Sequence, residues 1–206
     1  MVQLQFPGIH KLLPATSLDN NLSYKKGVII LNKSAVVITT RTIAVCNLED
    51  LFLSSEKDEE VQKKVYEILN YMEGKVFPIS YWEELTKKSL IEYNQDEDVL
   101  FIKGSGYEKN LYNYLEGFNV IDVINILKTI QFKNPPESKE ANYYMDFQFI
   151  KQFVSAFSNV LKIDKLKVDQ TSSYYTIKAL EHEIFFAIAK DEEIEYWEID
   201  SNINTF

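Results

Sequence analysis

The chain has 206 residues, a length that suits one or two domains, and 46% of them are hydrophobic, enough to build a packed core. Its formal net charge of −9 and its sequence pI of about 4.9 argue against a protein that coats nucleic acid non-specifically. Arg41 is the single arginine among 22 basic residues, so bidentate reading of bases or phosphates by arginine is nearly excluded.

The first block of the chain predicts a strand, a short helix and three further strands. Val2–Phe6 alternates apolar residues with glutamine, which is typical of a half-buried strand. Ile9–Leu13 has room for only a turn or two of helix, because Pro14 follows it. The runs Leu22–Leu31 and Ala35–Leu48 are rich in Val, Ile and Thr and are broken by turn residues, so they supply the strands.

A helix is predicted between the first block and the second. Glu49–Glu60 is acidic and polar and is expected to be a loop. Val61–Glu73 then carries one apolar stripe at helical spacing, and Gly74 is placed to end the helix. The stripe consists of Val61, Val65, Ile68, Leu69 and Met72.

The second block has the same predicted order as the first. Val76–Ile79 is expected as a strand and contains Pro78, which is expected at a sheet edge or at a strand start. Ser80 and Glu83 have the spacing of a capping box for a short helix at Tyr81–Lys88. Three strands are expected to follow, at Leu90–Tyr93, Val99–Lys103 and Glu108–Leu115.

A connector is expected between the second and third blocks. Gly117–Phe132 is apolar and fits either a buried helix or an extended segment crossing an apolar surface. Lys133–Asn142 contains two prolines among polar residues and has the composition of a linker.

The third block is predicted as a strand at Tyr143–Phe147, a helix from about Phe147 to Leu161, and strands after it. The apolar stripe of this helix is Ile150, Phe153, Val154, Phe157 and Leu161. Its opposite face has no acidic residue and consists of Gln148, Lys151, Gln152, Ser155, Ser158, Asn159 and Lys162. This face is either an ordinary polar surface or one that meets phosphates loosely. The strands are expected at Leu166–Gln170, Tyr174–Leu180, Ile184–Ala189 and Ile194–Ile199.

The residues that usually carry catalysis or bind metals form no recognisable motif. His10 and His182 have no second ligand at zinc spacing, and Cys46 lies in a strand-like run that favours burial. Nucleophile-elbow and phosphate-loop motifs are missing from the sequence. The acidic clusters Asp58–Glu60, Asp96–Asp98 and Asp191–Glu193 are expected in turns or at helix starts, although paired carboxylates could also hold Mg²⁺ in a nuclease. We therefore expect no enzyme, no metal and no cofactor.

The order strand, helix, strand, strand, strand thus starts near Val2, Val76 and Tyr143. With the runs Val76–Lys88, Asp98–Gly104, Leu115–Asn119, Met145–Phe157 and Glu183–Ala189, the chain resembles DNA polymerase sliding clamps, a family with bacterial, eukaryotic, archaeal and phage members. The resemblance implies an α+β fold of repeated βαβββ half-domains, with short helices on one face of antiparallel sheets. It implies a clamp-like domain at 1–116 with an extra helix near 61–73, a connector at 117–142, and a second clamp-like domain at 143–206. Three halves are found where two full domains need four.

The function that the resemblance implies is that of a processivity factor of phage or mobile-element type. It would encircle double-stranded DNA as a homo-oligomer, without reading sequence, and tether a DNA polymerase or clamp-loader peptide. The candidate DNA-binding residues are Lys11, Lys87, Lys88, Lys151 and Lys162. The alternative is a clamp-like interaction module, an adaptor or inhibitor, that does not encircle DNA. With no signal peptide or membrane span in the sequence, a cytoplasmic location in a bacterium or an infected host cell is expected.

Overall fold

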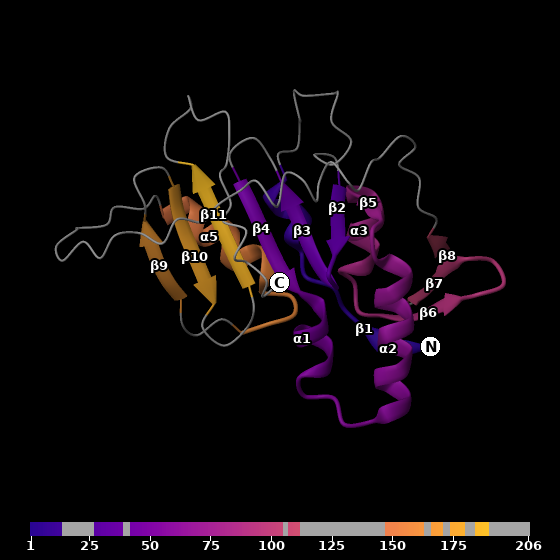
Figure 1. The fold of residues 1–206 in the computed structure, drawn as a ribbon. Coiled ribbons are helices and arrows are strands. Elements are labelled where there is room, and N and C mark those ends of the chain that lie inside the picture. The colour runs from indigo at the N-terminus through magenta and orange to yellow at the C-terminus, as the bar shows by residue number, and fades with distance from the viewer. Residues whose placement is uncertain are drawn as a thin grey trace.

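The computed structural model describes residues 1–13, 27–38, 42–104, 107–111, 147–162, 166–170, 174–179 and 184–189. Within these ranges the protein is a mixed α+β structure with few helices, and every strand pair is antiparallel (Figure 1). The α+β class with antiparallel sheets, predicted from the sequence, is therefore confirmed.

The elements of the first block and the segment after it are β1 (Val2–Leu4), the 3-10 helix η1 (Ile9–Leu12), β2 (Gly27–Leu31), β3 (Ser34–Ile38), β4 (Thr42–Asn47), α1 (Leu48–Leu53) and α2 (Glu59–Met72). The second block contains β5 (Val76–Pro78), α3 (Ile79–Leu85), β6 (Ser89–Asn94), β7 (Val99–Gly104) and β8 (Tyr107–Leu111). The third contains α5 (Phe147–Phe157), β9 (Leu166–Gln170), β10 (Tyr174–Ala179) and β11 (Ile184–Ala189).

The strands form two sheets, and the first strands of the two leading blocks are exchanged between them. The smaller sheet has the order β1-β6-β7-β8, and the larger has the order β5-β2-β3-β4-β11-β10-β9. Strand β1 of the first block pairs with β6 of the second, while β5 of the second block pairs with β2 of the first. The third block joins the larger sheet where β11 pairs with β4. The predicted edge position of β5 is confirmed among the described strands.

Helix η1 lies on β2, β3 and β4 and ends where the sequence predicts. Leu13 has extended backbone angles, φ −77° and ψ 137°, as expected for a residue that precedes a proline. The strands beneath η1 pair small side chains with one another, Ala35 with Cys46 and Val37 with Ala44. These residues share one hydrophobic core with η1. Their side chains are small, so the helix can approach the sheet closely.

A helix, α1, occupies the segment that the sequence assigned to a loop, so the prediction for Glu49–Glu60 was wrong over its first part. The side chain of Asn47 accepts a hydrogen bond from the backbone N–H of Asp50 at 3.0 Å and caps the helix. Leu48 is fully buried, and Leu51 and Phe52 pack partly against the core. The acidic composition concealed a helix that is stabilised by its cap and by tertiary packing.

Helix α2 confirms the predicted helix and its apolar stripe. Asp58 caps it by accepting hydrogen bonds from the N–H groups of Glu60 and Val61 at 2.9 and 3.2 Å. Four of the five stripe residues are buried, and Val61 is half-buried. Gly74 follows the helix with φ 72°, the left-handed conformation that glycine adopts at no steric cost.

The predicted capping box of α3 is not formed. The helix begins at Ile79, its N-cap is Pro78, and no side chain caps it. Ser80 therefore lies inside the first turn, and Glu83 remains exposed. Residue Trp82 instead fixes the helix, because its ring is fully buried and its Nε1 donates to the carbonyl oxygen of Pro7 at 2.8 Å.

Helix α5 confirms the third predicted helix, but its buried face is rotated from the expected one. Phe153, Ala156 and Phe157 are fully buried, whereas Val154 is 36% exposed. In Figure 1 the helix crosses behind β10 and β11. The rotation follows from packing: the two phenylalanines fill the core, and the small Ala156 lies against the chain at Gly8.

Several predictions fall outside the described residues. They concern the start of the third block at 143–146, the connector segments 117–132 and 133–142, and the last expected strand at 194–199. His182 also lies outside. Among the described residues, no helix has both the length and the apolar character that crossing a membrane requires.

Candidate nucleic-acid interface

The short helices of the three blocks lie side by side. Helix η1 is central and packs against α5 and against α3. Ile9 and Leu12 of η1, Trp82 of α3, and Phe153 and Phe157 of α5 belong to one buried core. Three helices that are far apart in the sequence therefore pack together around one hydrophobic core.

The side-chain amide of Asn159, just after α5, joins the three helices. Its Oδ1 accepts from the N–H of Gly8 at 3.2 Å, and its Nδ2 donates to the carbonyl oxygen of Phe6 at 2.8 Å and to that of Thr86 at 3.4 Å. The sequence pattern predicts Asn159 on the polar face of the helix. The structure shows that it is only half-exposed and links the segment before η1 to the end of α3.

Gly8 allows this close approach. A Cβ at position 8 would lie 3.0 Å from the carbonyl oxygen of Ala156, tighter than side chains normally pack. The next residue back, Pro7, accepts the hydrogen bond from Trp82. Helices α3 and α5 thus both contact the segment just before η1, which fixes their relative positions.

Lys11 and Lys151 lie on adjoining helices. The Nζ of Lys11 in η1 is 3.4 Å from the carbonyl oxygen of Ser155 in α5, and both lysines are exposed. Lys151 is four residues before Ser155, so it lies one helical turn away on the same face. The structure therefore brings these two candidate residues into one neighbourhood.

Lys87, Lys88 and Lys162 form a second group at the ends of α3 and α5. Lys87 and Lys88 directly follow Thr86, the residue whose carbonyl accepts from Asn159, and Lys162 lies three residues after Asn159. All three are exposed. Lysines beyond a helix C-terminus are favoured by the partial negative charge of the helix dipole.

Acidic residues of α3 lie among these lysines. The Nζ of Lys87 is 2.8 Å from Oε2 of Glu84, and this ion pair raises the pKa of the Lys87 ammonium group. Lys109 of β8 approaches Oε1 of the same glutamate at 3.8 Å. Part of the positive charge on this side of α3 is therefore neutralised by Glu84.

His10 is buried in η1, with 8% of its surface exposed. Its Nδ1 has no hydrogen-bond partner within the described part of the chain. Burial lowers the pKa of the imidazole, the nearby Glu83 carboxylate raises it, and Lys11 lowers it. The lowered pKa favours a neutral ring, so His10 adds little positive charge to this surface near pH 7.

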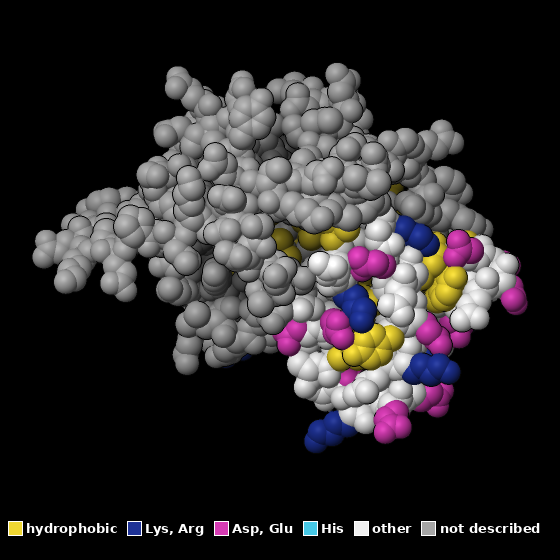
Figure 2. Space-filling view, in the orientation of Figure 1, with side chains coloured by type: hydrophobic (Ala, Val, Ile, Leu, Met, Phe, Trp, Pro, Cys, Tyr) yellow, Lys and Arg dark blue, Asp and Glu magenta, His cyan; other side chains and the backbone are white. Residues whose placement is uncertain are grey.

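The opposite charge predominates on α1 and α2. The segment 48–73 carries eight acidic residues and three lysines. Figure 2 shows the face that carries these helices, with Asp and Glu side chains interspersed with lysines. Among the residues that the structure describes, acids thus predominate on the α1–α2 segment, and lysines on the η1, α3 and α5 side.

The described acidic clusters have structural roles. Asp58 caps α2, and Asp98 accepts a hydrogen bond from the Tyr93 hydroxyl at 2.9 Å in the β6–β7 turn. Both clusters are thus located as the sequence predicts, one at a helix start and one in a turn. No three His, Cys, Asp or Glu side chains gather into a possible metal site in the described ranges.

Fold and surface together define an α+β protein with two antiparallel sheets and a lysine-bearing set of adjoining short helices. Comparison with protein families, curated proteins and solved structures gives no match for the chain.

Sequence reasoning missed two contributors to this surface. Asn159 was taken for a surface residue, although an asparagine near a helix end that must pack against two segments is a frequent hydrogen-bonding junction. Glu84 was not weighed against Lys87, although the two stand three residues apart across the C-terminal end of α3. Residue spacing alone would have revealed the Glu84–Lys87 ion pair, whereas the role of Asn159 is visible only in the tertiary structure.

Proposed function

We propose that this protein is a DNA sliding clamp, a processivity factor that encircles double-stranded DNA as an oligomer. The main support is the reciprocal strand exchange, in which β1 pairs with β6 and β5 pairs with β2. Each of the two blocks, which have the same element order, thus gives its first strand to the sheet of the other. This arrangement is expected for a clamp domain made of two βαβββ halves. On this proposal α1 and α2 are an insertion between the halves.

The surface chemistry agrees with the proposed function. Lys11, Lys87, Lys88, Lys151 and Lys162 line the η1, α3 and α5 side and would contact phosphates without reading bases. Acidic residues on the α1–α2 segment would keep the outside of the ring away from DNA. Partner polymerase or clamp-loader peptides would bind elsewhere on the ring.

Ring closure would use sheet edges. Among the described strands, β8 ends the smaller sheet and β9 ends the larger one. Head-to-tail pairing of β8 in one copy with β9 in the next would satisfy both edges and close into a ring if the rotation allows it.

Topological retention on DNA tests this proposal without a clamp loader. A linear duplex with biotin at both ends is incubated with the protein, streptavidin is added to block the ends, and the DNA is washed at high salt. We expect retention on the blocked duplex and loss after a restriction enzyme frees an end. Equal loss from blocked and open DNA, together with a monomer by sedimentation at micromolar concentration, would exclude encirclement.

A charge-matched pair of variants tests the surface. The triple variant Lys87→Ala, Lys88→Ala and Lys151→Ala should lower the slope of log affinity against log salt by about 3 for each subunit that contacts DNA, since each phosphate contact contributes roughly 0.9. The control removes Lys57, Lys63 and Lys64, which lie at and before α2. It should leave the slope unchanged. A larger change of the slope in the control would mean that DNA contacts the α2 side of the molecule and not the η1, α3 and α5 side.

The second candidate is a clamp-like adaptor that does not encircle DNA. Glu83 and Glu84 on α3 favour it, because they reduce the positive charge that a DNA-lining surface needs. A stable monomer with no retention on blocked duplex would support this alternative.

A further inference from the structure

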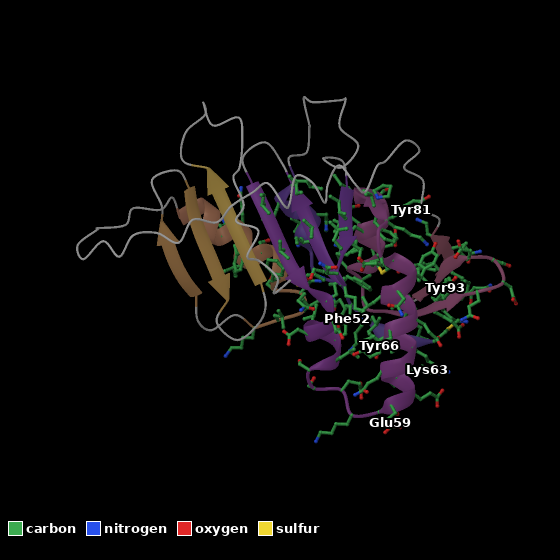
Figure 3. The ribbon with its side chains drawn as sticks, in the orientation of Figure 1. Phe52, Glu59, Lys63, Tyr66, Tyr81 and Tyr93 are labelled. Atoms are coloured by element: carbon green, nitrogen blue, oxygen red, sulfur yellow. The ribbon has the colours of Figure 1, made fainter. Side chains whose placement is uncertain are left out.

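An open groove of about 250 Å³ lies between β1, α1, α2 and the end of α5. Its walls include the consecutive residues Val2–Gln5 on one side and Leu51, Phe52 and Val61 on the other, with Glu56 at the helix side. We call it the β1 groove. Figure 3 labels Phe52 on α1 and Tyr66 on the neighbouring helix α2.

The groove exposes the backbone edge of β1. Side chains alternate along a strand, so Val2 and Leu4 are buried in the core while Gln3 is exposed. Four consecutive residues therefore cannot all line one hollow through their side chains. What they share on that side is the main chain, with its N–H and C=O groups.

This backbone edge has no partner within the described residues. Strand β1 stands at the end of its sheet and pairs with β6 alone. Just beyond β1, the Gln5 side chain and the N–H of Phe6 donate to the carbonyl oxygens of Thr86 and Leu85. The carbonyl oxygen of Phe6 accepts from Asn159, which lines the same groove, so the open part of the edge is Val2–Gln5. An exposed strand edge of this kind is a template for an added strand.

The facing wall suits a segment with apolar side chains. Leu51, Phe52 and Val61 are each partly exposed although they pack against the core. An extended chain that pairs with Val2–Gln5 would span about 13 Å and direct alternate side chains toward these residues. The ring of Phe52 is held in place by an edge-on contact with Phe6 at 4.9 Å between centroids, so this wall is pre-formed.

The charge around the β1 groove selects a basic partner. Glu56 lines it, and it belongs to the 48–73 segment with its eight acidic residues and three lysines. Lysine or arginine side chains flanking the apolar positions would complement this charge. An acidic segment would be repelled.

We propose that the β1 groove binds an extended peptide segment of a partner protein, with alternating apolar residues and flanking basic residues, by strand addition to β1. The site adjoins the end of α5 but contains none of the five candidate DNA-binding lysines, so this proposal holds whether or not the protein encircles DNA. It would give the molecule a second, peptide-directed interaction on its acidic side.

The test begins with panning of a random peptide library against the full chain, followed by measurement of the recovered peptides by isothermal titration. We expect recovered peptides to carry net positive charge and to alternate apolar residues. Amide hydrogen exchange with and without the recovered peptide should slow at Val2–Gln5. Protection confined to other segments would overturn the proposal.

Matched variants separate binding in the groove from non-specific attraction. Val61→Gln, in the groove, should weaken the recovered peptide roughly tenfold, while Val154→Gln, on the exposed face of α5, should not. Glu56→Gln keeps the oxygen that accepts from the N–H groups of Lys57 and Asp58 and removes only the charge. It should weaken basic peptides more than Glu67→Gln does on α2.

Two outcomes would contradict the proposal. Peptides that bind all four variants with equal affinity would place the site elsewhere. An oligomer that dissociates with Val61→Gln but not with Val154→Gln would mean that a second copy of this chain, and not a foreign peptide, occupies the β1 edge.

Discussion

His10 combines burial with a lowered pKa, and the sign of its effect on stability follows directly. The unfolded chain binds a proton at this histidine near pH 6.5, whereas the folded chain, with its lowered pKa, resists protonation. Stability is therefore unaffected above that pH and falls as the pH drops through the window between the two pKa values. Burial is the main cause of the shift, with Glu83 opposing it.

Replacing His10 tests this linkage. His10→Met should make the free energy of unfolding less dependent on pH between about pH 7 and pH 5, because the titrating buried group is gone. Urea unfolding at both pH values measures it. His182 is retained in both proteins, so an unchanged pH dependence would show that His10 does not titrate as inferred.

Cys46 is the single cysteine and is fully buried on β4. Burial raises the pKa of its thiol well above the usual range, and the Asp50 carboxylate adds to the shift. Since the thiolate is the reactive form, iodoacetamide should not label the folded protein at about pH 8, but should label it rapidly in denaturing urea. Fast labelling without urea would mean that β4 is accessible in the folded state.

At the scale of the elements, Glu73 stabilises the hairpin between β2 and β3. Asn32 and Lys33 both have positive φ, 48° and 55°, the conformation of a type I′ hairpin turn. Their N–H groups donate to the two carboxylate oxygens of Glu73 at 2.7 and 2.9 Å. The end of α2 is thereby attached to the turn of the larger sheet.

Removing this carboxylate should cost stability. Glu73→Ala should lower the free energy of unfolding by about 1–3 kcal/mol, the range for losing charge-assisted hydrogen bonds. Glu67→Ala on the same helix is the matched control and should change it by less than about 0.5 kcal/mol. Equal effects in thermal or urea unfolding would show that the turn does not depend on Glu73.

At the scale of the whole molecule, one amide connects segments that are 73 to 153 residues apart. Asn159 bonds the chain at Gly8, Phe6 and Thr86. Asn159→Asp keeps an acceptor for Gly8 but removes the donor to both carbonyl oxygens and adds a partly buried charge. We expect a loss of about 2–4 kcal/mol, with α5 separating from η1 before the sheets unfold.

Hydrogen exchange locates that loss. Amides of α5 should exchange faster in Asn159→Asp, while those of β6 and β7 should be little changed. Ser158→Asp, one residue away and exposed, is the control for added charge alone. Uniform acceleration across both sheets would show instead that the third block does not open separately.

Periodicity was a good guide where one face of an element is buried. The stripe of α2, the strands β9 to β11 and the end of η1 before Pro14 were all predicted from residue type and spacing. The helix at Leu48–Leu53 was not, because its acidic residues resemble a loop and its stability comes from the Asn47 cap and from burial of Leu48. The same limit applies to Val154, which is apolar yet exposed.

The sequence by itself determined most of the elements and their order along the chain, the apolar face of α2, and an excess of acid that argues against general nucleic-acid coating. These properties are local, since side-chain pattern and turn residues act within a few positions of the chain. The tertiary structure alone decided that β1 and β5 exchange sheets, that Asn159 joins three helices, and that the edge of β1 lies open beside α1 and α2. Such features depend on pairing between residues far apart in sequence, and no local pattern specifies which distant strand edge or carbonyl oxygen will be the partner.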